Sequence, residues 1–264
     1  MFRKNHPVAW SYHRNSYRWQ HDPPSAGENA GGTPAFKEFV DLPTVTLPPP
    51  LALHQELSEA ICGRFSCRRF KSEMVPIESL ATLLHWSYGK LGTSHPYDME
   101  IVTRPVPSAG GLYPLELYIM AERVGDLRAG IYHYNVLGHL LERLHDGAMP
   151  PQSLSDLFAF QPCISECAFV LVFTCVFERS LWKYKDRGYR YMLFEAGHAA
   201  QNANLAATAL RLASLDLGGF FDADLASALG VEVEEEAPLY AVAVGWPEGA
   251  DPGLLRMPRP TDDG

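Results

Sequence analysis

The sequence predicts one α/β or α+β domain that follows a distinct N-terminal arm. Strand-like and helix-like segments alternate along the chain after residue 50, and no obvious linker separates them. One strand candidate is an almost continuous apolar run, which is typical of a strand buried on both faces. A long helix candidate covers residues 190–213 without a proline. Such interleaved elements on one chain favour a single layered domain.

Length and charge are those of an ordinary globular protein. The chain has 264 residues, of which 47% are apolar and 20% charged. At this length roughly 70–75% of the unfolded surface can be buried, so the core needs no covalent staples. The net charge of −9 argues against a nucleic-acid partner, which would need a basic patch. It does not exclude an anionic ligand, because a local arginine cluster can hold a phosphate inside an acidic protein.

The five cysteines are expected to be free thiols, most of them buried. Their number is odd, and no pair has the C-x2-C spacing of a zinc site. We therefore predict no metal centre. The sequence also has no N-terminal apolar segment of the secretory type and no apolar run of the ~18 residues that a membrane span needs. We expect a soluble, cytoplasmic protein with no membrane partner.

Residues 1–50 differ in composition from the rest and are interpreted as an extended arm and a loop. Aromatic and basic residues dominate the start, and a Pro/Gly-rich stretch runs from Asp22 to Pro34. The arm has too many aromatic residues for a disordered tail. We expect it to pack on the main domain, residues 51–264, or on a partner subunit.

The elements of the main domain are predicted from hydrophobic spacing in chain order. Apolar residues recur at helical spacing over about 52–63 and 77–89, and Gly89 provides a stop signal for the second helix. Two further helices are predicted over 190–213 and 222–230. Strands are predicted over Leu115–Ala121, Gly130–Tyr134, Leu140–Leu144, Ala168–Phe177 and Pro238–Gly245.

The long helix carries a stripe of small residues. The stripe consists of Ala196, Ala200, Ala203 and Ala207. Small residues at this spacing let another helix approach closely, which would suit a subunit interface. Close packing against the chain's own sheet explains the same spacing equally well.

Familiar nucleotide and hydrolase motifs are absent from the sequence. There is neither a G-x-G-x-x-G after a strand nor a G-x4-G-K-[ST] loop, so no Rossmann site or P-loop is indicated. Ser108 is not part of a G-x-S-x-G elbow and is not a hydrolase nucleophile by that criterion.

A basic segment, Arg64–Phe70, is a candidate phosphate clamp. It contains three arginines and a serine within a few residues. Guanidinium groups offer forked donors that match phosphate oxygens, and Ser66 adds a hydroxyl. Spacing alone does not distinguish such a clamp from a solvated basic turn.

Two glycine-containing loops are candidates for close contact with a flat ligand. Residues 107–114 read PSAGGLYP and precede a predicted strand, and 217–221 read LGGFF after the long helix. Glycine lets a backbone come close to a ligand and point its amides at it. The first loop could equally be a plain surface turn. The second could equally be a helix exit with a left-handed glycine.

Residues 182–191 are rich in groups that transfer protons. A lysine or tyrosine acts as a general base or acid only where burial or a neighbouring charge brings its pKa toward neutrality. Without further context, a solvated charged segment explains this composition as well.

Taken together and in this order, these segments resemble the SagB/ThcOx branch of the nitroreductase superfamily, the azoline dehydrogenases. The resemblance runs from about Tyr12 to Pro247. Its most specific pieces are PSAGGLYPLELY (Pro107–Tyr118), GIYHYN (Gly130–Asn135), RYMLFEAGHAAQN (Arg190–Asn202) and LYAVAVGWP (Leu239–Pro247). It implies an α+β nitroreductase-like fold with a central mixed, mainly antiparallel sheet flanked by helices. It also implies a homodimer, with the long helix and two FMN sites at the interface.

The resemblance further implies roles for individual residues. The FMN phosphate would be held by Arg64, Ser66 and Arg68, with Phe65 standing where many relatives have a second arginine. Lys183 and Tyr184 match a pair that the family links to catalysis. The other cofactor-binding positions it implies are Pro107, Ser108, Ala109, Gly110, Gly111, Glu195, Gln201, Leu217, Gly218 and Gly219, together with Arg256 or Arg259.

The implied activity is FMN-dependent oxidation of azolines to thiazoles or oxazoles in a peptide or amino-acid-derived substrate. In this interpretation Tyr184, next to the positive charge of Lys183, is the base for the Cα proton or assists it. A peptide substrate would be recognised with a cyclodehydratase-type partner protein. Two alternatives remain open: an NAD(P)H-dependent reductase of nitro compounds or quinones, and a flavin-free scaffold subunit of a peptide-modifying complex.

Overall fold

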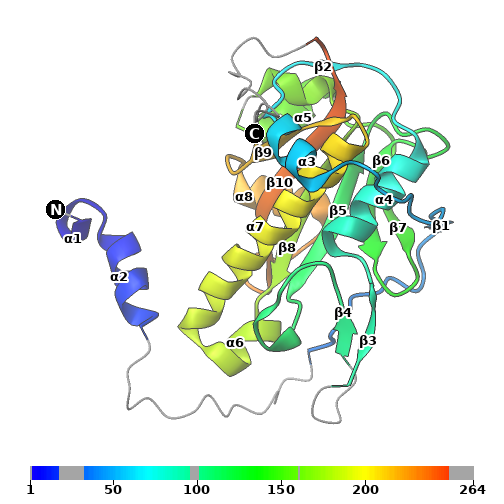
Figure 1. Ribbon diagram of the computed structural model, residues 1–264. Helices are drawn as coiled ribbons and strands as arrows, with labels where there is room; N and C mark the ends of the chain where they lie inside the picture. The colour runs from blue at the N-terminus through cyan, green and yellow to red at the C-terminus, as the bar shows by residue number, and fades with distance from the viewer. Residues whose placement is uncertain (1, 18–32, 96–100, 160, 250–264) are drawn as a thin grey trace, which may run out of the picture.

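The computed structural model describes residues 2–17, 33–95, 101–159 and 161–249, and its centre is an eight-stranded sheet (Figure 1). The strand order is β1-β7-β6-β5-β8-β10-β2, with β9 also paired to β10. All named neighbours in this sheet run antiparallel. The strands are β1 (Thr44–Thr46), β2 (Phe70–Lys71), β5 (Leu115–Ala121), β6 (Gly130–Asn135), β7 (Leu140–Asp146), β8 (Phe169–Val176), β9 (Ala213–Leu217) and β10 (Glu236–Pro247), with a separate pair β3 (Gly92–Ser94) and β4 (Ile101–Thr103).

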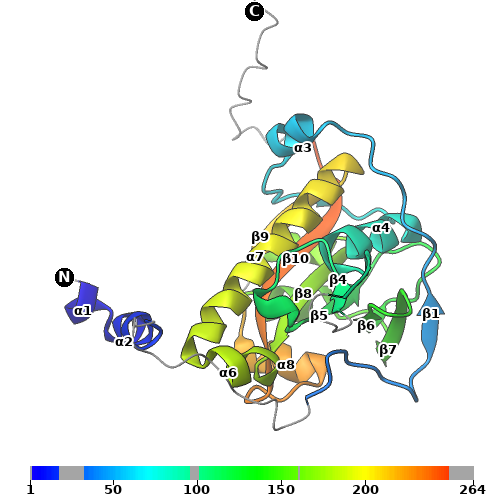
Figure 2. The ribbon, with the colours of Figure 1, turned by 60° about the horizontal axis from the view of Figure 1, so that its bottom comes forward.

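Helices cover both faces of the sheet. They are α1 (Phe2–Asn5), α2 (Pro7–Asn15), α3 (Leu57–Gly63), α4 (Ile77–Tyr88), α5 (Pro151–Leu157), α6 (Glu178–Tyr184), α7 (Asp186–Ala209) and α8 (Asp222–Leu229), with 3-10 turns η2 (Ala109–Gly111) and η3 (Pro162–Glu166). One hydrophobic core joins α4 and α7 to one face of the sheet (Figure 2). A second core joins α5, η3 and α8 to the other face. The predicted α+β fold is confirmed.

The central strands were predicted closely because both of their faces are buried. Seven of the eight positions of β8 are buried, which explains its continuous apolar sequence. Both ends of the long helix differ from the prediction. Helix α7 begins four residues earlier, at Asp186, and ends at Ala209. Arg211 then takes a left-handed conformation (φ 62°), and residues 213–217 pair with β10 as a strand.

The predicted helix over residues 52–63 is shorter than expected. Leu51, the residue just before it, is bound to α4: Thr82 Oγ1 accepts a hydrogen bond from the Leu51 N–H (2.8 Å), Trp86 donates to the Leu51 carbonyl (3.3 Å), and residues 52–56 are not helical. Only Leu57–Gly63 is helical. Tertiary hydrogen bonds therefore outweigh the local helical pattern here.

The small-residue stripe of α7 packs inside its own chain. Ala196, Ala200, Ala203 and Ala207 are each at most 2% exposed and belong to the core shared with α4 and the sheet. Of the two interpretations of the stripe, packing within the chain is the one the structure supports. The outward face of α7 instead presents Leu193 and Phe194.

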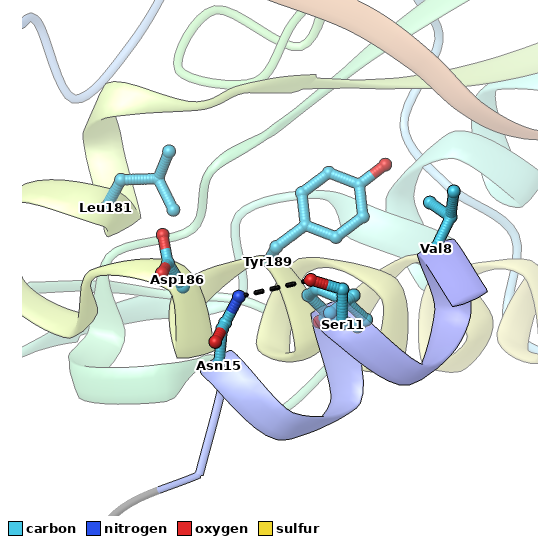
Figure 3. Close-up of a pocket in the computed structure, with 7 residues that line it drawn as sticks. Val8, Ser11, Asn15, Leu181, Asp186 and Tyr189 are labelled. Carbon is cyan, nitrogen blue, oxygen red and sulfur yellow. Dashed lines mark hydrogen bonds between the residues drawn. The ribbon is translucent and has the colours of Figure 1, made fainter. Parts of the chain in front are cut away.

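The start of the N-terminal arm forms the two short helices α1 and α2, so the predicted extended conformation is wrong for residues 2–15, whereas residues 33–50 contain no helix. Pro7 is the first residue of α2, a position that proline favours. The last carbonyls of α2 accept hydrogen bonds from α7: Arg190 donates to His13 (2.7 Å) and Arg187 to Ser16 (2.9 Å). The arm therefore lies against the main domain at the start of α7, and a cavity of about 470 Å³ separates α2 from Leu181, Asp186 and Tyr189 (Figure 3).

The cysteines, possible metal ligands and possible membrane spans say little about function. All five cysteines are free thiols, and Cys67, Cys167 and Cys175 are buried. Among the described residues there is neither a cluster of side chains suited to a metal ion nor a helix long and apolar enough to cross a membrane.

Candidate active site

The loop before β5 has the backbone conformation that its glycines permit. Gly110 and Gly111 both have positive φ angles (66° and 67°), a region that side-chain-bearing residues rarely adopt. Ser108 Oγ accepts a hydrogen bond from the Tyr113 N–H at 2.9 Å and closes the loop. The loop is thus a fixed turn, and Gly110 is exposed on its surface.

Lys183 and Tyr184 lie directly against Gly110. A methyl group built on Gly110 would stand 2.5 Å from Tyr184 Oη and 2.8 Å from Lys183 Nζ. The lysine ammonium also lies 5.5 Å from the centre of the Tyr184 ring. Both residues end helix α6, and Lys185, with φ 51°, turns the chain sharply into α7. The structure therefore brings together the predicted catalytic pair and the predicted glycine loop, although more than seventy residues separate them in the sequence.

A buried carboxyl group supports the loop from behind. Glu195 of α7 is 2% exposed and accepts a hydrogen bond from Tyr88 Oη at 2.5 Å. Burial raises the pKa of Glu195 to about 7, and the opposing contributions come from hydrogen bonds with Ser108 and Tyr88 and from the charge of Arg104. Tyr88 Oη in turn accepts a hydrogen bond from the Leu115 N–H (3.2 Å), so Glu195 connects the loop to the first residue of β5.

Arg104 supplies a buried positive charge next to this carboxyl group. Its guanidinium carbon lies 4.3 Å from the ring centre of Tyr88, 5.1 Å from that of Tyr113 and 5.4 Å from that of Phe36. Aromatic faces attract such a cation, most strongly where water is excluded. Its Nε and Nη1 atoms have no hydrogen-bond partner among the described residues.

The arginine segment lies at the other end of α7. Ser66 forms a parallel bridge with Ser214 of β9, and the Cys67 N–H donates to the Ser214 carbonyl at 2.9 Å. Arg68 is exposed, and its Nη1 donates to the Ser66 carbonyl at 3.4 Å. Arg64 is half-buried, and Phe65 packs against the second core. The segment is an ordered turn with guanidinium groups available to solvent.

One chain does not bring the arginine segment and the glycine loop together. The loop contacts α7 at Glu195, whereas the arginine segment follows α3, whose Gly63 lies against Thr208 of α7. Thirteen residues of α-helix span about 20 Å. A single ligand that uses both elements would therefore need them from different copies of the chain, or would have to bridge this separation.

The remaining predicted positions lie in different surroundings. Pro107 is exposed and Ala109 half-buried on the loop itself, and Gln201 is exposed on α7. Leu217 ends β9, so the glycine pair does not follow the long helix directly, and neither Gly218 nor Gly219 has a positive φ. Of the two alternatives left open for this loop, the helix exit with a left-handed glycine is therefore wrong, because the left-handed residue is Arg211. Arg256 and Arg259 lie outside the described residues.

Sequence reasoning missed the residues that support the loop. Tyr88 lies at the end of the helix predicted over 77–89 and has the spacing of an ordinary apolar position, and nothing near Arg104 in the sequence indicates a buried guanidinium. Both approach the loop only after the chain folds, so no local spacing could have identified them. Asn202, which donates to the Pro105 carbonyl at 3.3 Å, belongs to the same group.

The fold and this arrangement define an oxidoreductase of the nitroreductase type. The model of the nitroreductase family matches residues 61–246, and the chain belongs to that family. It is 32% identical over 190 residues to the nitroreductase homologue MJ1384 of Methanocaldococcus jannaschii, a match that covers 72% of this chain and 90% of the relative.

Two further relatives are named for the processing of microcin B17 and of trifolitoxin. The chain is 34% identical over 154 residues to the microcin B17-processing protein McbC of Escherichia coli, covering 56% of each protein. It is 32% identical over 141 residues to the trifolitoxin-processing protein TfxB of Rhizobium leguminosarum bv. trifolii, covering 52% of this chain but only 38% of TfxB. These relatives support the SagB-type branch of the superfamily.

The fold likewise matches a peptide-modifying assembly. A chain of the E. coli microcin synthetase McbBCD complex with truncated pro-MccB17 bound superposes with a TM-score of 0.60 and 24% identity, over 93% of both chains. At this identity the likeness concerns the fold alone.

Proposed function

We propose that the protein is an FMN-dependent dehydrogenase of the SagB type, which oxidises azoline rings in a peptide or amino-acid-derived substrate. The observation that carries this proposal is the contact of Lys183 and Tyr184 with Gly110. Similarity to McbC and TfxB, whose names record peptide processing, supports the substrate class. A cyclodehydratase-type partner protein is the corresponding proposal for how a peptide is recognised.

The residues present fit an FMN group. Gly110 and Gly111 carry no side chain, so the backbone of the loop is open to a flat ring system on its exposed side, while Tyr184 and Lys183 occupy the space that a methyl group at Gly110 would need. Arg64, Ser66 and Arg68 would hold the phosphate through forked and hydroxyl donors. Bound FMN would supply a hydride acceptor, with molecular oxygen as the terminal oxidant.

Azoline oxidation removes two hydrogens from one ring, and the protein must handle the first as a proton. A base takes the proton from Cα while the second hydrogen leaves from Cβ as a hydride, and a ring double bond forms between the two carbons. Tyr184 is the proposed base, because its oxygen is presented at the loop beside the Lys183 ammonium. The lysine charge stabilises the phenolate form, which is the form that accepts a proton.

A homodimer is the assembly that we propose. The arginine segment and the glycine loop of one chain lie at opposite ends of a helical span of about 20 Å. Large apolar side chains are exposed toward both ends of this span: Leu193 and Phe194 of α7, next to Glu195, and Leu57 and Ile61 on α3, which precedes the arginine segment. Exposed apolar surface of this kind marks interaction sites. A second copy that covers these side chains would add its own loop to the phosphate clamp.

An NAD(P)H-dependent reductase is the second candidate, favoured by the 90% coverage of the nitroreductase homologue MJ1384. An absorption spectrum of the purified protein, followed at ~450 nm during anaerobic addition of NADPH, separates the candidates. A yellow protein that NADPH does not bleach supports the dehydrogenase, and prompt bleaching supports the reductase. A colourless protein that cannot be loaded with FMN would contradict both and leave a scaffold role.

A further inference from the structure

The helix that presents Lys183 and Tyr184 is too short to hold its own orientation. Helix α6 has seven residues, and isolated helices of this length are not stable in water. Its orientation must therefore come from tertiary contacts. Within α6 the buried residues are Arg179 and Ser180, so the anchoring side chain at its start is a charged one.

Arg179 makes two close contacts outside its helix, an ion pair through Nη1, which does not meet hydrogen-bond geometry, and a hydrogen bond through Nε. Its Nη1 atom lies 2.6 Å from Glu116 Oε1 on the central strand β5, and both side chains are only 4% exposed. Its Nε atom donates a hydrogen bond to the Pro34 carbonyl at 2.7 Å. A buried arginine with two partners in different directions fixes both the position and the rotation of the residue that carries it.

Glu116 is itself held by a row of polar groups that crosses the sheet. His133 Nε2 lies 3.0 Å from Glu116 Oε2, and His133 Nδ1 lies 2.7 Å from Glu142 Oε2 on β7. Burial alone would lower the pKa of His133, but its hydrogen bonds and charge interactions with both glutamates raise it. The imidazolium and Arg179 together lower the pKa of Glu116 against the effect of burial. Along the row, the negative charges of Glu142 and Glu116 therefore alternate with the positive charges of His133 and Arg179.

Residues 33–43 cross over this row and complete it. The Lys37 N–H donates to Glu116 Oε1 at 3.2 Å, and the Phe39 ring lies 5.3 Å from that of His133. The Lys37 ammonium pairs with Glu236 Oε2 at 2.7 Å. This crossing segment thus links the N-terminal part of the chain to the base of α6.

We propose that Arg179 is a positioning residue: its buried pair with Glu116 sets the rotation of α6 and so holds Lys183 and Tyr184 against the Gly110 loop. Arg179 and Lys183 are four residues apart and lie on the same face of the helix, one turn from each other. A change in how Arg179 is held therefore moves Lys183 directly. The inference rests on the proposed function for its catalytic meaning, but the placement of Lys183 can be tested without it.

The test compares three variants of the full chain. Arg179→Lys keeps the charge but loses the forked geometry. Glu116→Gln keeps the size of the partner and removes its charge. Lys37→Met is the matched control, because it removes a partly buried ion pair from the same cluster and leaves the Arg179–Glu116 pair in place.

The first measurement is the reactivity of Lys183 toward trace amounts of acetic anhydride, whose acetyl group is transferred to the amine with release of acetate. Mass spectrometry of the peptide that contains Lys183 gives the rate as a function of pH. We expect the rate to rise several-fold in Arg179→Lys and in Glu116→Gln, and to stay at the wild-type value in Lys37→Met. If Arg179→Lys does not fold, the rate of Lys183 acetylation in Glu116→Gln tests the inference instead.

Two results would overturn the inference. One is an unchanged Lys183 rate in the folded Arg179 or Glu116 variant. The other is an equal change in Lys37→Met, which would mean that any loss of charge in the cluster acts in the same way. If the protein oxidises an azoline peptide, Arg179→Lys should also lower kcat by about tenfold or more at unchanged KM, as expected for a misplaced catalytic group. Absence of azoline turnover in the wild type would contradict the proposed function, while the labelling result would still decide the role of Arg179.

Discussion

Gly110 is the residue at which backbone geometry and proposed chemistry meet. Its φ of 66° strains any side chain, and a methyl group would also collide with Tyr184 and Lys183. Gly230 provides a matched comparison, because its φ is 70° and a methyl group there would meet no atom within 4 Å. We expect Gly110→Ala and Gly230→Ala each to lose about 1 kcal/mol of stability. Only Gly110→Ala should lose flavin-dependent turnover.

Thermal unfolding and steady-state kinetics of the two glycine variants separate these effects. Equal loss of turnover in both would assign the effect to general destabilisation. Full activity in Gly110→Ala would show that the contact with the catalytic pair is not needed.

Lys183 and Tyr184 are expected to act in chemistry rather than in cofactor binding. Lys183→Met and Tyr184→Phe should each lower turnover by about 100-fold or more, the range typical of a lost general base or its activating charge. Bound FMN, measured from the visible spectrum, should remain. Lys185→Met is the control, since Lys185 is exposed and its ammonium contacts only the Trp182 carbonyl in the described chain. A colourless Lys183 or Tyr184 variant would show that the residue is needed to bind FMN and would contradict a role confined to catalysis.

At the scale of elements, Glu195 joins α7, α4 and the glycine loop, and its titration should be visible in stability. Its pKa is raised from an ordinary value of 4.5 to about 7, with burial as the main cause. The stabilising, protonated form is fully present below pH 4.5, and its contribution is lost as the pH rises through about 7. The full effect is at most ~3 kcal/mol.

Glu195→Gln should therefore flatten the stability profile between pH 5 and pH 8. We expect the variant to be at least as stable as the wild type at pH 8, because it buries no charge there. Chemical denaturation at several pH values measures this, with Glu59→Gln on an exposed position of α3 as the control. A profile as steep as that of the wild type would show that another group titrates in this range.

The elements themselves illustrate what the sequence could and could not predict. Strands β5 and β8 follow from their apolar runs, because burial on both faces makes nearly every residue apolar, with Glu116 and Thr174 as the buried polar exceptions. The short strand β9 was not predicted, and the predicted long helix ran on to residue 213, since a single left-handed residue, Arg211, follows the end of that helix without any glycine or proline. Helix α6 was seen only as a charged segment. Its contacts with the rest of the fold, among them the Arg179–Glu116 pair, join residues that are distant in the chain.

The whole molecule raises the question of how two halves of one cofactor site are joined. The predicted residues divide into the arginine segment at one end of α7 and the loop with its catalytic pair at the other, with about 20 Å of helix between their contacts. The arginine segment, the glycine loop and the Lys-Tyr pair could be recognised in the sequence, but the distance between the first and the other two could not. The twofold dimer that we propose would resolve the separation, because each proposed site would then take one element from each chain.

Mixed dimers test this arrangement directly. One variant removes the phosphate clamp (Arg64→Ala with Arg68→Ala), and the other fills the loop (Gly110→Val). Each variant alone should bind little FMN. When the two are co-expressed with different tags, half of the dimers contain one chain of each kind. In such a dimer one site carries both defects and the other carries neither, so FMN binding should recover to about a quarter of the wild-type value. If each site is built from a single chain, every site keeps one defect and mixing restores nothing. Recovery confined to dimers that carry both tags would establish that a second copy of the chain completes the site.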